Sequence, residues 1–370
     1  MITFLNNAFA TRHRGKVCVL RIDLNVDMKS IEGQFRLRSV IPTILLLRAH
    51  KIRVVLVSHR GRPKGVDKSL SLKSFTSIIE KEIKEKVEFL PTFDFGLLRD
   101  TISSSDNNIF LLENIRFLKG EEENSELLGR QLASLGEIYV NDAFAVSHRA
   151  HASVHAITKH IRSVGGLQLQ KEVVALTGAM KKMEHPYIFI LGGAKVKDKL
   201  PLIAHFWKKA DMFLMGGGPA NTLLAAQGIP MHNSLYDASL VKEVRAYAFS
   251  AQVITPTDVT CEKMNIVDIG EETGEEYAEI IRSARMIVWN GPMGWHEKKK
   301  YSQGTARVWK AALSNKKATI VIGGGETIAS LSTVGREIKK VPKNIFLSTG
   351  GGAMLSFLSG EKLPGLVALQ

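Results

Sequence analysis

The sequence has few cysteines and no long apolar run. Only two of its 370 residues are cysteine, Cys18 and Cys261, and they lie far apart, so we expect two reduced, partly buried thiols and no disulfide. No apolar run reaches the roughly 18 residues of a membrane-spanning helix. The N-terminal charges follow a short apolar stretch, the reverse of the order in a secretory signal. We therefore expect a cytoplasmic protein with no membrane partner.

Acidic residues are also scarce. Lys and Arg number 50 against 36 Asp and Glu, which gives a formal net charge of +14. This excess has two interpretations: attraction to anions, nucleic acid included, or a general bias of the surface. The lysine-rich runs at 181–183 and 297–301 lack interleaved aromatic residues, and no recognised nucleic-acid-binding motif accompanies them. Nucleic acid is therefore not expected as the main partner.

Short runs of Val, Ile, Leu and Phe alternate with helical periods along the chain. The runs are continuous, which is typical of strands buried on both faces of a parallel sheet. Residues 71–87 and 124–135 carry apolar side chains on one stripe and are predicted helices. This order predicts an α/β fold of two doubly wound, Rossmann-like lobes with parallel sheets, and the length suits about two domains.

A helix near residues 165–186 marks the expected boundary between the lobes. Its apolar residues recur at steps of four, three and four, from Leu169 to Met180, and Pro186 follows its end. Two interpretations stay open, a linker helix that packs on both lobes or a core helix of one domain. With a linker helix, the domains are 1–168 and 169–349.

In the first half of the chain, the apolar runs end at charged or polar residues. Ligands of parallel α/β sheets bind at the carboxyl ends of the strands, so these side chains should converge. The candidates are Arg21, Asp23, Asn25, His59, Arg62, Arg116 and Arg149, with Arg36 and Arg38 from the loop after the first run. A single arginine is more often a surface ion pair, but a cluster at successive strand ends indicates a small anion with phosphate, carboxylate and hydroxyl groups.

In the second half, the apolar runs end at glycine. The runs beginning at 188, 213, 287, 320 and 345 each lead into a glycine-rich turn, where backbone can approach phosphate oxygens closely. Neither GxGxxG with a following acidic residue nor GxxxxGK[ST] is present, so the dinucleotide fingerprint and the P-loop are absent. We expect a polyphosphate site of another kind, and a nicotinamide dehydrogenase is disfavoured.

Three charged residues of the second half are further candidates. Lys195 and Lys199 lie four apart and could share a helix face directed at phosphates, although such pairs are common on exposed helices. Glu326 in the GGGET segment is a candidate Mg²⁺ ligand, because Mg²⁺ commonly takes one or two carboxylates beside nucleotide phosphates. The alternative is a glutamate favoured by the dipole of a helix N-terminus.

The ordered motifs of the chain resemble the signature of phosphoglycerate kinase. They are RIDLN (21–25), RLRSVIPTI (36–44), SHRGRPKG (58–65), LLENIRF (111–117), VNDAF with HRAHAS (140–153), LGGAKVKDK (191–199), WNGPMG (289–294), IGGGET (322–327) and STGGGA (348–353). The resemblance implies a monomeric glycolytic enzyme that, by lobe closure, transfers phosphate reversibly between 1,3-bisphosphoglycerate and ADP, giving 3-phosphoglycerate and ATP. It also implies that 350–370 return to the first lobe.

The resemblance assigns roles to matching positions. Asp23, Asn25, Arg36, His59, Arg62, Arg116 and Arg149 match phosphoglycerate-binding positions. Lys199, Gly216, Asn290, Glu297, Gly324, Gly325, Glu326 and Thr327 match nucleotide-binding positions, with Mg²⁺ on Glu326. Arg36 and Lys195 match the groups that stabilise the transferring phosphoryl group.

The chain departs from the family pattern mainly in its second half. Glu326 replaces a usual Asp, Trp295 and His296 stand where Val and Phe are usual, and residues 258–268 are shorter than the family norm. An active kinase with an altered nucleotide site is the leading hypothesis. The alternative is a catalytically weakened phosphoglycerate-binding homologue with a separate role for its basic surface.

Overall fold

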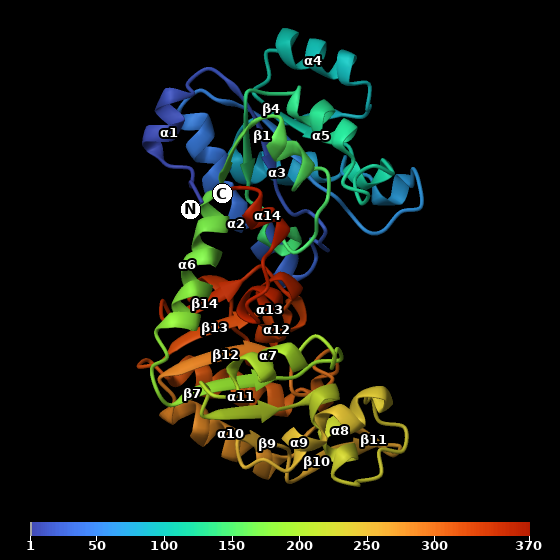
Figure 1. The fold of residues 1–370 in the computed structure, drawn as a ribbon, viewed down its shortest axis with the longest axis vertical. Coiled ribbons are helices and arrows are strands. Elements are labelled where there is room, and N and C mark those ends of the chain that lie inside the picture. Colours follow the sequence, from blue (N-terminus) through green and yellow to red (C-terminus); the bar gives the residue numbers. More distant parts are fainter. Residues whose placement is uncertain (1) are drawn as a thin grey trace. The chain divides into compact units, whose positions relative to one another are not determined.

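The computed structural model describes residues 2–370 (the backbone alone for residue 339), and residue contacts divide them into two compact units (Figure 1). The N-terminal unit runs to Val173 and also contains Lys362–Gln370, and the C-terminal unit comprises Val174–Glu361. The division falls within helix α6, Leu167–Lys181. Residues 350–361 thus belong to the C-terminal unit, whereas we expected all of 350–370 in the first lobe.

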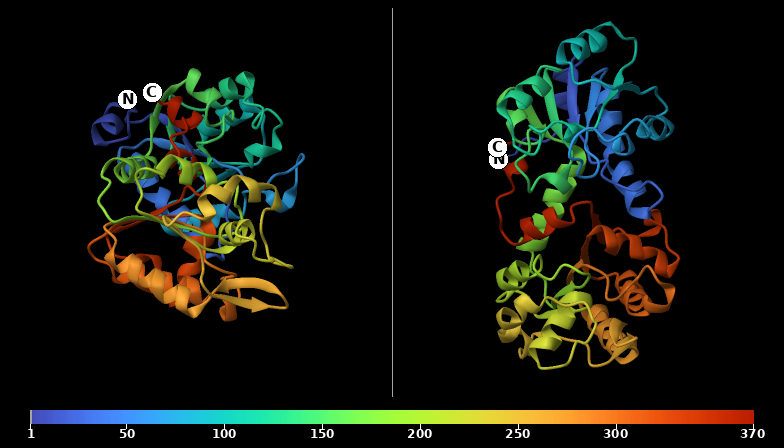
Figure 2. Two further views of the ribbon diagram at one scale, coloured as in Figure 1. Left: turned by 60° about the horizontal axis from the view of Figure 1, so that its bottom comes forward. Right: turned by 90° about the vertical axis from the view of Figure 1, so that its right-hand side faces the viewer.

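The N-terminal unit is built on a six-stranded parallel sheet with the strand order β3-β4-β2-β1-β5-β6. Its strands are β1 Val17–Arg21, β2 Arg53–Val57, β3 Glu88–Leu90, β4 Ile109–Leu112, β5 Ile138–Asn141 and β6 Arg162–Gly165. Its helices, besides the first part of α6, are α1 Asn7–Arg12, α2 Ile31–Ala49, α3 Phe75–Ile83, α4 Phe95–Ser104, α5 Glu126–Ala133 and α14 Pro364–Val367, with 3₁₀ turns η1 Lys68–Leu70, η2 Ile115–Phe117, η3 Phe144–Val146 and η4 Ala156–Lys159. Helices cover both faces of this sheet (Figure 2).

The C-terminal unit repeats this plan with the strand order β14-β13-β12-β7-β8-β9 and adds an antiparallel pair, β10-β11. Its strands are β7 Tyr187–Leu191, β8 Met212–Met215, β9 Val253–Ile254, β10 Val259–Glu262, β11 Asn265–Ile269, β12 Met286–Asn290, β13 Thr319–Gly323 and β14 Ile345–Ser348. Its helices, besides the last part of α6, are α7 Leu200–Phe206, α8 Gly217–Ala226, α9 Val241–Ala248, α10 Glu271–Ser283, α11 Gln303–Ser314, α12 Gly325–Ala329 and α13 Gly352–Leu358, with 3₁₀ turns η5 Ala238–Leu240, η6 Lys299–Tyr301, η7 Ser330–Val334 and η8 Ile338–Lys340.

The predicted α/β class with two parallel sheets is confirmed. The central strands of both sheets are buried along almost their whole length, because helices cover both faces and leave no position for a solvent-facing side chain. The register also aligns the strand ends. Arg21 pairs with Asn141 across β1 and β5, and Asn290 pairs with Gly323 across β12 and β13. Each unit therefore gathers its strand ends, and the loops after them, along one edge.

Three local expectations are wrong. Arg36 and Arg38 lie within α2 and not in a loop. Helix α7 begins only at Leu200, so Lys195 and Lys199 share a turn and not a helix face. Cys261 is exposed, because β10 belongs to a two-stranded hairpin outside the main sheet, whereas Cys18 is buried in β1.

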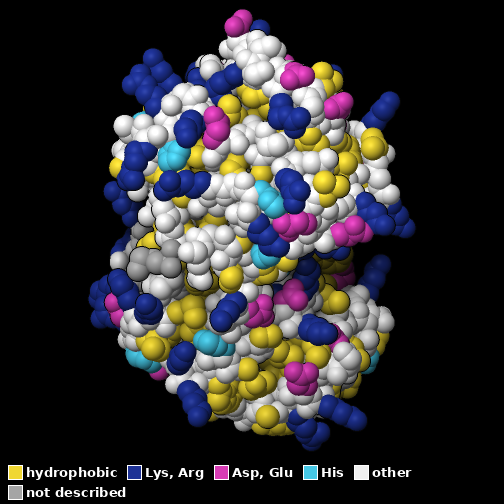
Figure 3. All heavy atoms as spheres, turned by 45° about the horizontal axis from the view of Figure 1, so that its top comes forward, with side chains coloured by type: hydrophobic (Ala, Val, Ile, Leu, Met, Phe, Trp, Pro, Cys, Tyr) yellow, Lys and Arg dark blue, Asp and Glu magenta, His cyan; other side chains and the backbone are white. Residues whose placement is uncertain are grey.

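The surface carries charged side chains of both signs. Lys and Arg side chains are spread over the face drawn in Figure 3, with Asp and Glu side chains among them. In residues 2–370, no helix combines the length and the apolar character that crossing a membrane requires.

Candidate active site

Arg21 is the buried centre of a polar network at the end of β1. Its Nε donates to Ser153 Oγ at 2.9 Å, its Nη1 donates to the carbonyl of Ile22, and its Nη2 lies 3.1 Å from His59 Nδ1. Ser153 Oγ in turn donates to Glu121 Oε1 at 2.6 Å. A fully buried guanidinium is thus held by oxygen and nitrogen acceptors, as the cost of burying a charge requires.

Asp23 and Arg36 form an ion pair beside this network. Arg36 Nη1 lies 2.8 Å from Asp23 Oδ2, and Arg36 Nη2 lies 2.6 Å from Glu32 Oε1. Burial opposes ionisation of Asp23, but the charge of Arg36, with the main-chain N–H of Asn25, outweighs it and lowers the pKa of the carboxyl. Asn25 is exposed, and its Oδ1 accepts the main-chain N–H of Gly61 at 2.8 Å.

Arg116 in η2 is buried with part of its hydrogen-bonding capacity unused. Its Nη1 donates to the carbonyl of Gly61 at 2.6 Å, and its Nε lies 3.3 Å from Glu122 Oε1 without making a hydrogen bond. Its Nη2 has no hydrogen-bond partner among the described residues. Burial lowers the pKa of Arg116, and neighbouring Arg149 and Arg21 add to this effect.

The positive charge of the cluster contributes to lowering the pKa values of two histidines, His59 and His151. Burial, with the charge of Arg21, lowers the pKa of His59 well below its usual value. Burial and the charge of Arg116 lower the pKa of His151 to about 4. Both rings are therefore neutral at physiological pH. A bound anion would offset the positive charge of the arginines, which contributes to these low pKa values.

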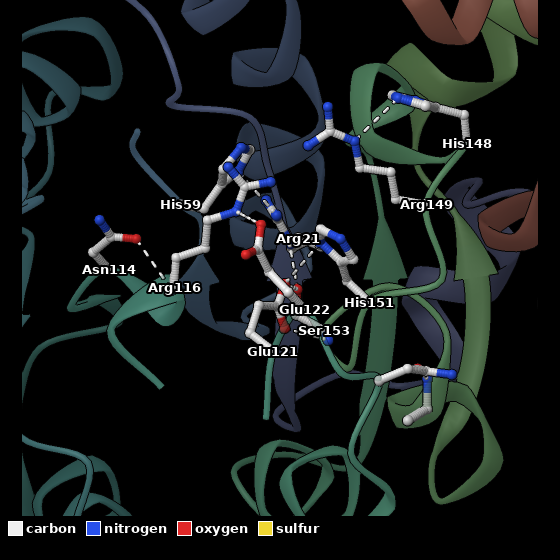
Figure 4. Close-up of polar contacts among 12 residues, drawn as sticks. Arg21, His59, Asn114, Arg116, Glu121, Glu122, His148, Arg149, His151 and Ser153 are labelled. Carbon is white, nitrogen blue, oxygen red and sulfur yellow. Dashed lines mark hydrogen bonds and ion pairs between the residues drawn. The ribbon is translucent and has the colours of Figure 1, made fainter. Parts of the chain in front are cut away.

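The structure brings most of the predicted first-half residues together. Figure 4 shows Arg21, His59 and Arg116 side by side, with His151 and Arg149 next to them. Arg149 Nε donates to His148 Nε2 at 3.1 Å. Arg62 is exposed, and its side chain has no hydrogen bond or ion pair with a described residue, whereas Arg38 is directed to Glu82, 3.2 Å from its Nε.

The supporting groups of this cluster escaped the sequence analysis. They come from the loops after β4 and β5: Ser153 Oγ accepts from Arg21, and Glu121 accepts from Ser153 and lies 3.8 Å from His151 Nδ1. In the sequence, the HRAHAS segment at 148–153 is recognisable only as part of a family motif. Its signal was a run of polar residues after an apolar strand, which by itself does not identify a partner at a distant position.

In the C-terminal unit, glycine is required where the turns after the strands meet. Gly217 has φ +53°, and a Cβ there would lie 2.7 Å from the carbonyl oxygen of Gly193. Gly291 has φ +98°, and a Cβ there would lie 2.1 Å from the carbonyl oxygen of Gly192. Both separations are shorter than non-bonded atoms tolerate, so main chain packs directly on main chain. The N–H groups of Gly193 and Gly217 donate to the carbonyls of Pro292 and Met293, which ties the turns together.

A cavity of about 440 Å³ lies against these turns. Gly193, Gly217 and Gly218 contribute backbone to its lining, and Glu297 and Glu326 contribute carboxylates. Apolar side chains complete the wall, among them Leu235, Val259, Ile266 and Met293. The cavity thus offers an apolar wall together with bare backbone and negative charge, a combination typical of small-molecule sites.

Two predicted lysines lie between β7 and α7 and are not part of the cavity lining. Lys199 is buried, and its Nζ donates to the carbonyl of Lys195 at 3.1 Å. Burial lowers the pKa of Lys199 to about 8, offset in part by Asp198 and Glu326. Lys195 is exposed.

Gly216, Asn290, Gly324, Gly325 and Thr327 build the turns themselves. Gly216 precedes α8, and Gly324, with φ +99°, precedes α12, which begins at Gly325. Asn290 Nδ2 donates to the carbonyl of Gly323 at 2.9 Å. Thr327 is fully buried beneath the turns.

A magnesium ligand set of one carboxylate fits this site. In the part of the chain that the structure describes, no three His, Cys, Asp or Glu side chains gather as a metal cluster. Mg²⁺ bound with a nucleotide does not need one, because phosphates and water supply most of its ligands. Glu326 is exposed and lines the cavity, so its carboxylate is available for such an ion.

Two Rossmann-like units, one with a cluster of buried arginines and the other with a glycine-walled cavity, define a transferase of phosphoryl groups. The family model described as PGK, Phosphoglycerate kinase, matches residues 5–361. The chain therefore belongs to the phosphoglycerate kinase family. It is a glycolytic phosphotransferase with a carboxyl group as acceptor, and its substrates are phosphoglycerate and ATP or ADP.

Individual relatives agree along the whole chain. A phosphoglycerate kinase of Dictyoglomus turgidum is 37% identical, and the match covers 96% of each chain. One of Lactobacillus gasseri is 35% identical over 96% of this chain and 97% of its own. Among solved structures, a phosphoglycerate kinase from Pyrococcus horikoshii is 31% identical, with a TM-score of 0.84 over 97% of this chain and 96% of its own. One from Coxiella burnetii is 30% identical, with a TM-score of 0.80 over 100% and 99%.

Proposed function

We propose that the two units divide the reactants between them. The arginine cluster of the N-terminal unit binds 3-phosphoglycerate or 1,3-bisphosphoglycerate, and the glycine-walled cavity of the C-terminal unit binds ADP or ATP. The observation that carries this proposal is Arg116, a buried guanidinium whose Nη2 has no hydrogen-bond partner among the described residues. Such a group is costly unless a ligand pairs with it, and a phosphate or carboxylate matches its planar fork.

On the phosphoglycerate side, Arg116, Arg149 and Arg62 supply positive charge. His59 supplies a neutral donor. A guanidinium only donates, so His59 Nδ1, which faces Arg21 Nη2, acts as an acceptor, and Nε2 carries the hydrogen. The Asp23 carboxylate and the Asn25 amide oxygen are suited to accept a hydrogen bond from the substrate hydroxyl.

On the nucleotide side, backbone amides and Lys199 bind the phosphates, and a carboxylate binds the ribose. Gly324, Gly325 and Thr327 lie at the N-terminus of α12, where amide groups approach phosphate oxygens, and Gly216 and Asn290 build the neighbouring turns. The cationic side chain of Lys199 pairs with a phosphate. Glu297 is an exposed carboxylate of the cavity lining, suited to accept hydrogen bonds from ribose hydroxyls.

For the transfer step, we assign charge neutralisation to Arg36 and Lys195. Phosphoryl transfer needs in-line positioning and stabilisation of the equatorial oxygens more than covalent help. Mg²⁺ held by Glu326 would neutralise phosphate charge when it is bound. The ion pairs with Asp23 and Glu32 hold the Arg36 guanidinium in place.

A coupled assay of the full chain tests this function. With 1,3-bisphosphoglycerate, ADP and Mg²⁺, the protein should form ATP, and Arg116→Met should remove most of that activity. Absence of ATP formation by the unmodified protein would overturn the proposal. We also infer a monomer in a reducing, cytoplasmic compartment, which its exposed free Cys261 suits. Sedimentation equilibrium at micromolar concentration tests the monomer.

A further inference from the structure

Trp295 is a large aromatic side chain that lines the cavity and stays 48% exposed. It follows the turn after β12, two residues before Glu297. Its main-chain N–H donates to the carbonyl of Val267 in β11 at 2.8 Å, which ties the turn to the β10-β11 hairpin. The indole thus offers an aromatic surface to a molecule that enters the cavity.

Two neighbours hold the indole in a fixed orientation. Lys298 Nζ lies 3.8 Å from the centroid of the Trp295 ring, a close cation–π contact. The ring of Tyr301 is stacked near it, with centroids 6.3 Å apart and an interplanar angle of 26°. The indole is therefore ordered before any ligand arrives, and a ligand that contacts it has little ordering entropy to overcome.

The apolar and polar parts of the cavity lining suit different parts of a ligand. Beside Trp295 the wall is apolar, with Val259, Ile266 and Met293, and the carboxylates and glycine turns supply its polar lining. A flat, largely apolar ring system suits the wall, and a hydroxylated, phosphorylated group suits the polar lining.

We propose that Trp295 is a specificity-determining residue that stacks on the base of the nucleoside diphosphate and favours purines over pyrimidines. The proposal rests on the proposed function, since it takes the cavity as the nucleotide site. A bicyclic purine covers more of the indole than a monocyclic pyrimidine does, and stacking strength grows with the area covered. Because Lys298 Nζ covers one face of the indole, the base stacks on the opposite face.

Calorimetric titration of the full chain with ADP and with CDP, both with Mg²⁺, tests this role. Trp295→Val should raise the Kd for ADP about tenfold and the Kd for CDP about threefold or less, which narrows the ratio between them. Trp295→Phe keeps an aromatic face and should keep most of the preference. The Kd for 3-phosphoglycerate should not change in either variant, which checks that they fold.

Tryptophan fluorescence gives a second reading. ADP should quench part of the emission of the unmodified protein, and that change should disappear in Trp295→Phe while its calorimetric ADP binding persists. Trp289 and Trp309 serve as an internal reference because they are fully buried, and the partly exposed Trp207 does not line the cavity. An unchanged ADP-to-CDP ratio in Trp295→Val overturns the stacking role and leaves the proposed function intact. Failure of the unmodified protein to bind ADP overturns both.

Discussion

The side-chain hydroxyl of Thr327 accepts a 2.7 Å hydrogen bond from the main-chain N–H of Gly291. The same hydroxyl donates to the carbonyl of Gly323 at 3.0 Å. One buried side chain thus joins the turns that follow β12 and β13, and the backbone offered to the nucleotide depends on it.

Thr327→Val should loosen these turns, because it keeps the shape and removes the hydroxyl. The N–H of Gly291 would lose its partner in a buried place, which costs about 1–3 kcal/mol in the free energy of unfolding. Urea denaturation should show this loss, and ADP binding should weaken with it. Thr327→Ser should restore most of both. Equal stability of the Val variant and the unmodified protein would contradict the account.

Arg36 and Arg38 form a matched pair on α2. Arg36→Met should lower kcat by about 10²–10³-fold, as for removal of a donor to developing charge. Arg38→Met should change kcat by less than about twofold, because Arg38 belongs to an exposed ion pair with Glu82. Steady-state kinetics measures both, with thermal melting to follow the loss of the Asp23 partner. Similar effects of the two substitutions would show that Arg36 has no special role.

Lys195 and Lys197 form a second pair, both exposed in the turn after β7. Lys195→Ala should lower kcat by about 10²–10³-fold and change the Kd of either substrate by less than about threefold, since the charge acts in the transition state. Lys197→Ala should leave both quantities nearly unchanged. Equal losses in kcat and in binding for Lys195→Ala would count against a transition-state role.

Lys199 should make nucleotide binding depend on pH. Burial lowers the pKa of its ammonium group to about 8, so the group is mostly charged at pH 7 and mostly neutral at pH 9. A phosphate binds the charged form, so affinity must fall as pH rises through this pKa, by about tenfold between pH 7 and pH 9. Calorimetry with Mg-ADP at the two values measures the fall. Lys199→Met should bind weakly at both, and a slope that survives in this variant would assign it to another group.

Glu326 should govern the response to magnesium. Glu326→Gln removes the charge and should raise the Mg²⁺ concentration for half-maximal activity at least about tenfold, while metal-free ADP binding changes by less than about twofold. Glu337→Gln is the control, because Glu337 is exposed and pairs with Lys340. An unchanged magnesium requirement in Glu326→Gln would place the metal on another group.

The end of a strand was predictable where a continuous apolar run forms a buried strand of a parallel sheet. The position of Arg21 at the end of a strand was predicted correctly, because β1 is buried and stops at that residue. Arg38 was placed wrongly with Arg36, because residues two apart on a helix point in different directions. Once both arginines lie in α2, only one of them can face Asp23.

Other features depend on contacts that a sequence pattern does not contain. Glu121 reaches Ser153 across 32 positions, and no periodicity relates the two. The β10-β11 hairpin was missed because its strands are short and half polar, and because Lys263 and Met264 occupy a turn where glycine or asparagine is usual. The position of Trp295 in the cavity wall likewise required the fold.

The most direct test of the division of reactants is calorimetric titration of the unmodified protein, Arg116→Met and Lys199→Met with 3-phosphoglycerate and with Mg-ADP. The account predicts that the unmodified protein binds both ligands, that Arg116→Met loses only 3-phosphoglycerate, and that Lys199→Met weakens only Mg-ADP. Binding of 3-phosphoglycerate without any binding of Mg-ADP by the unmodified protein would contradict the account and would identify a phosphoglycerate-binding homologue that has lost the kinase reaction.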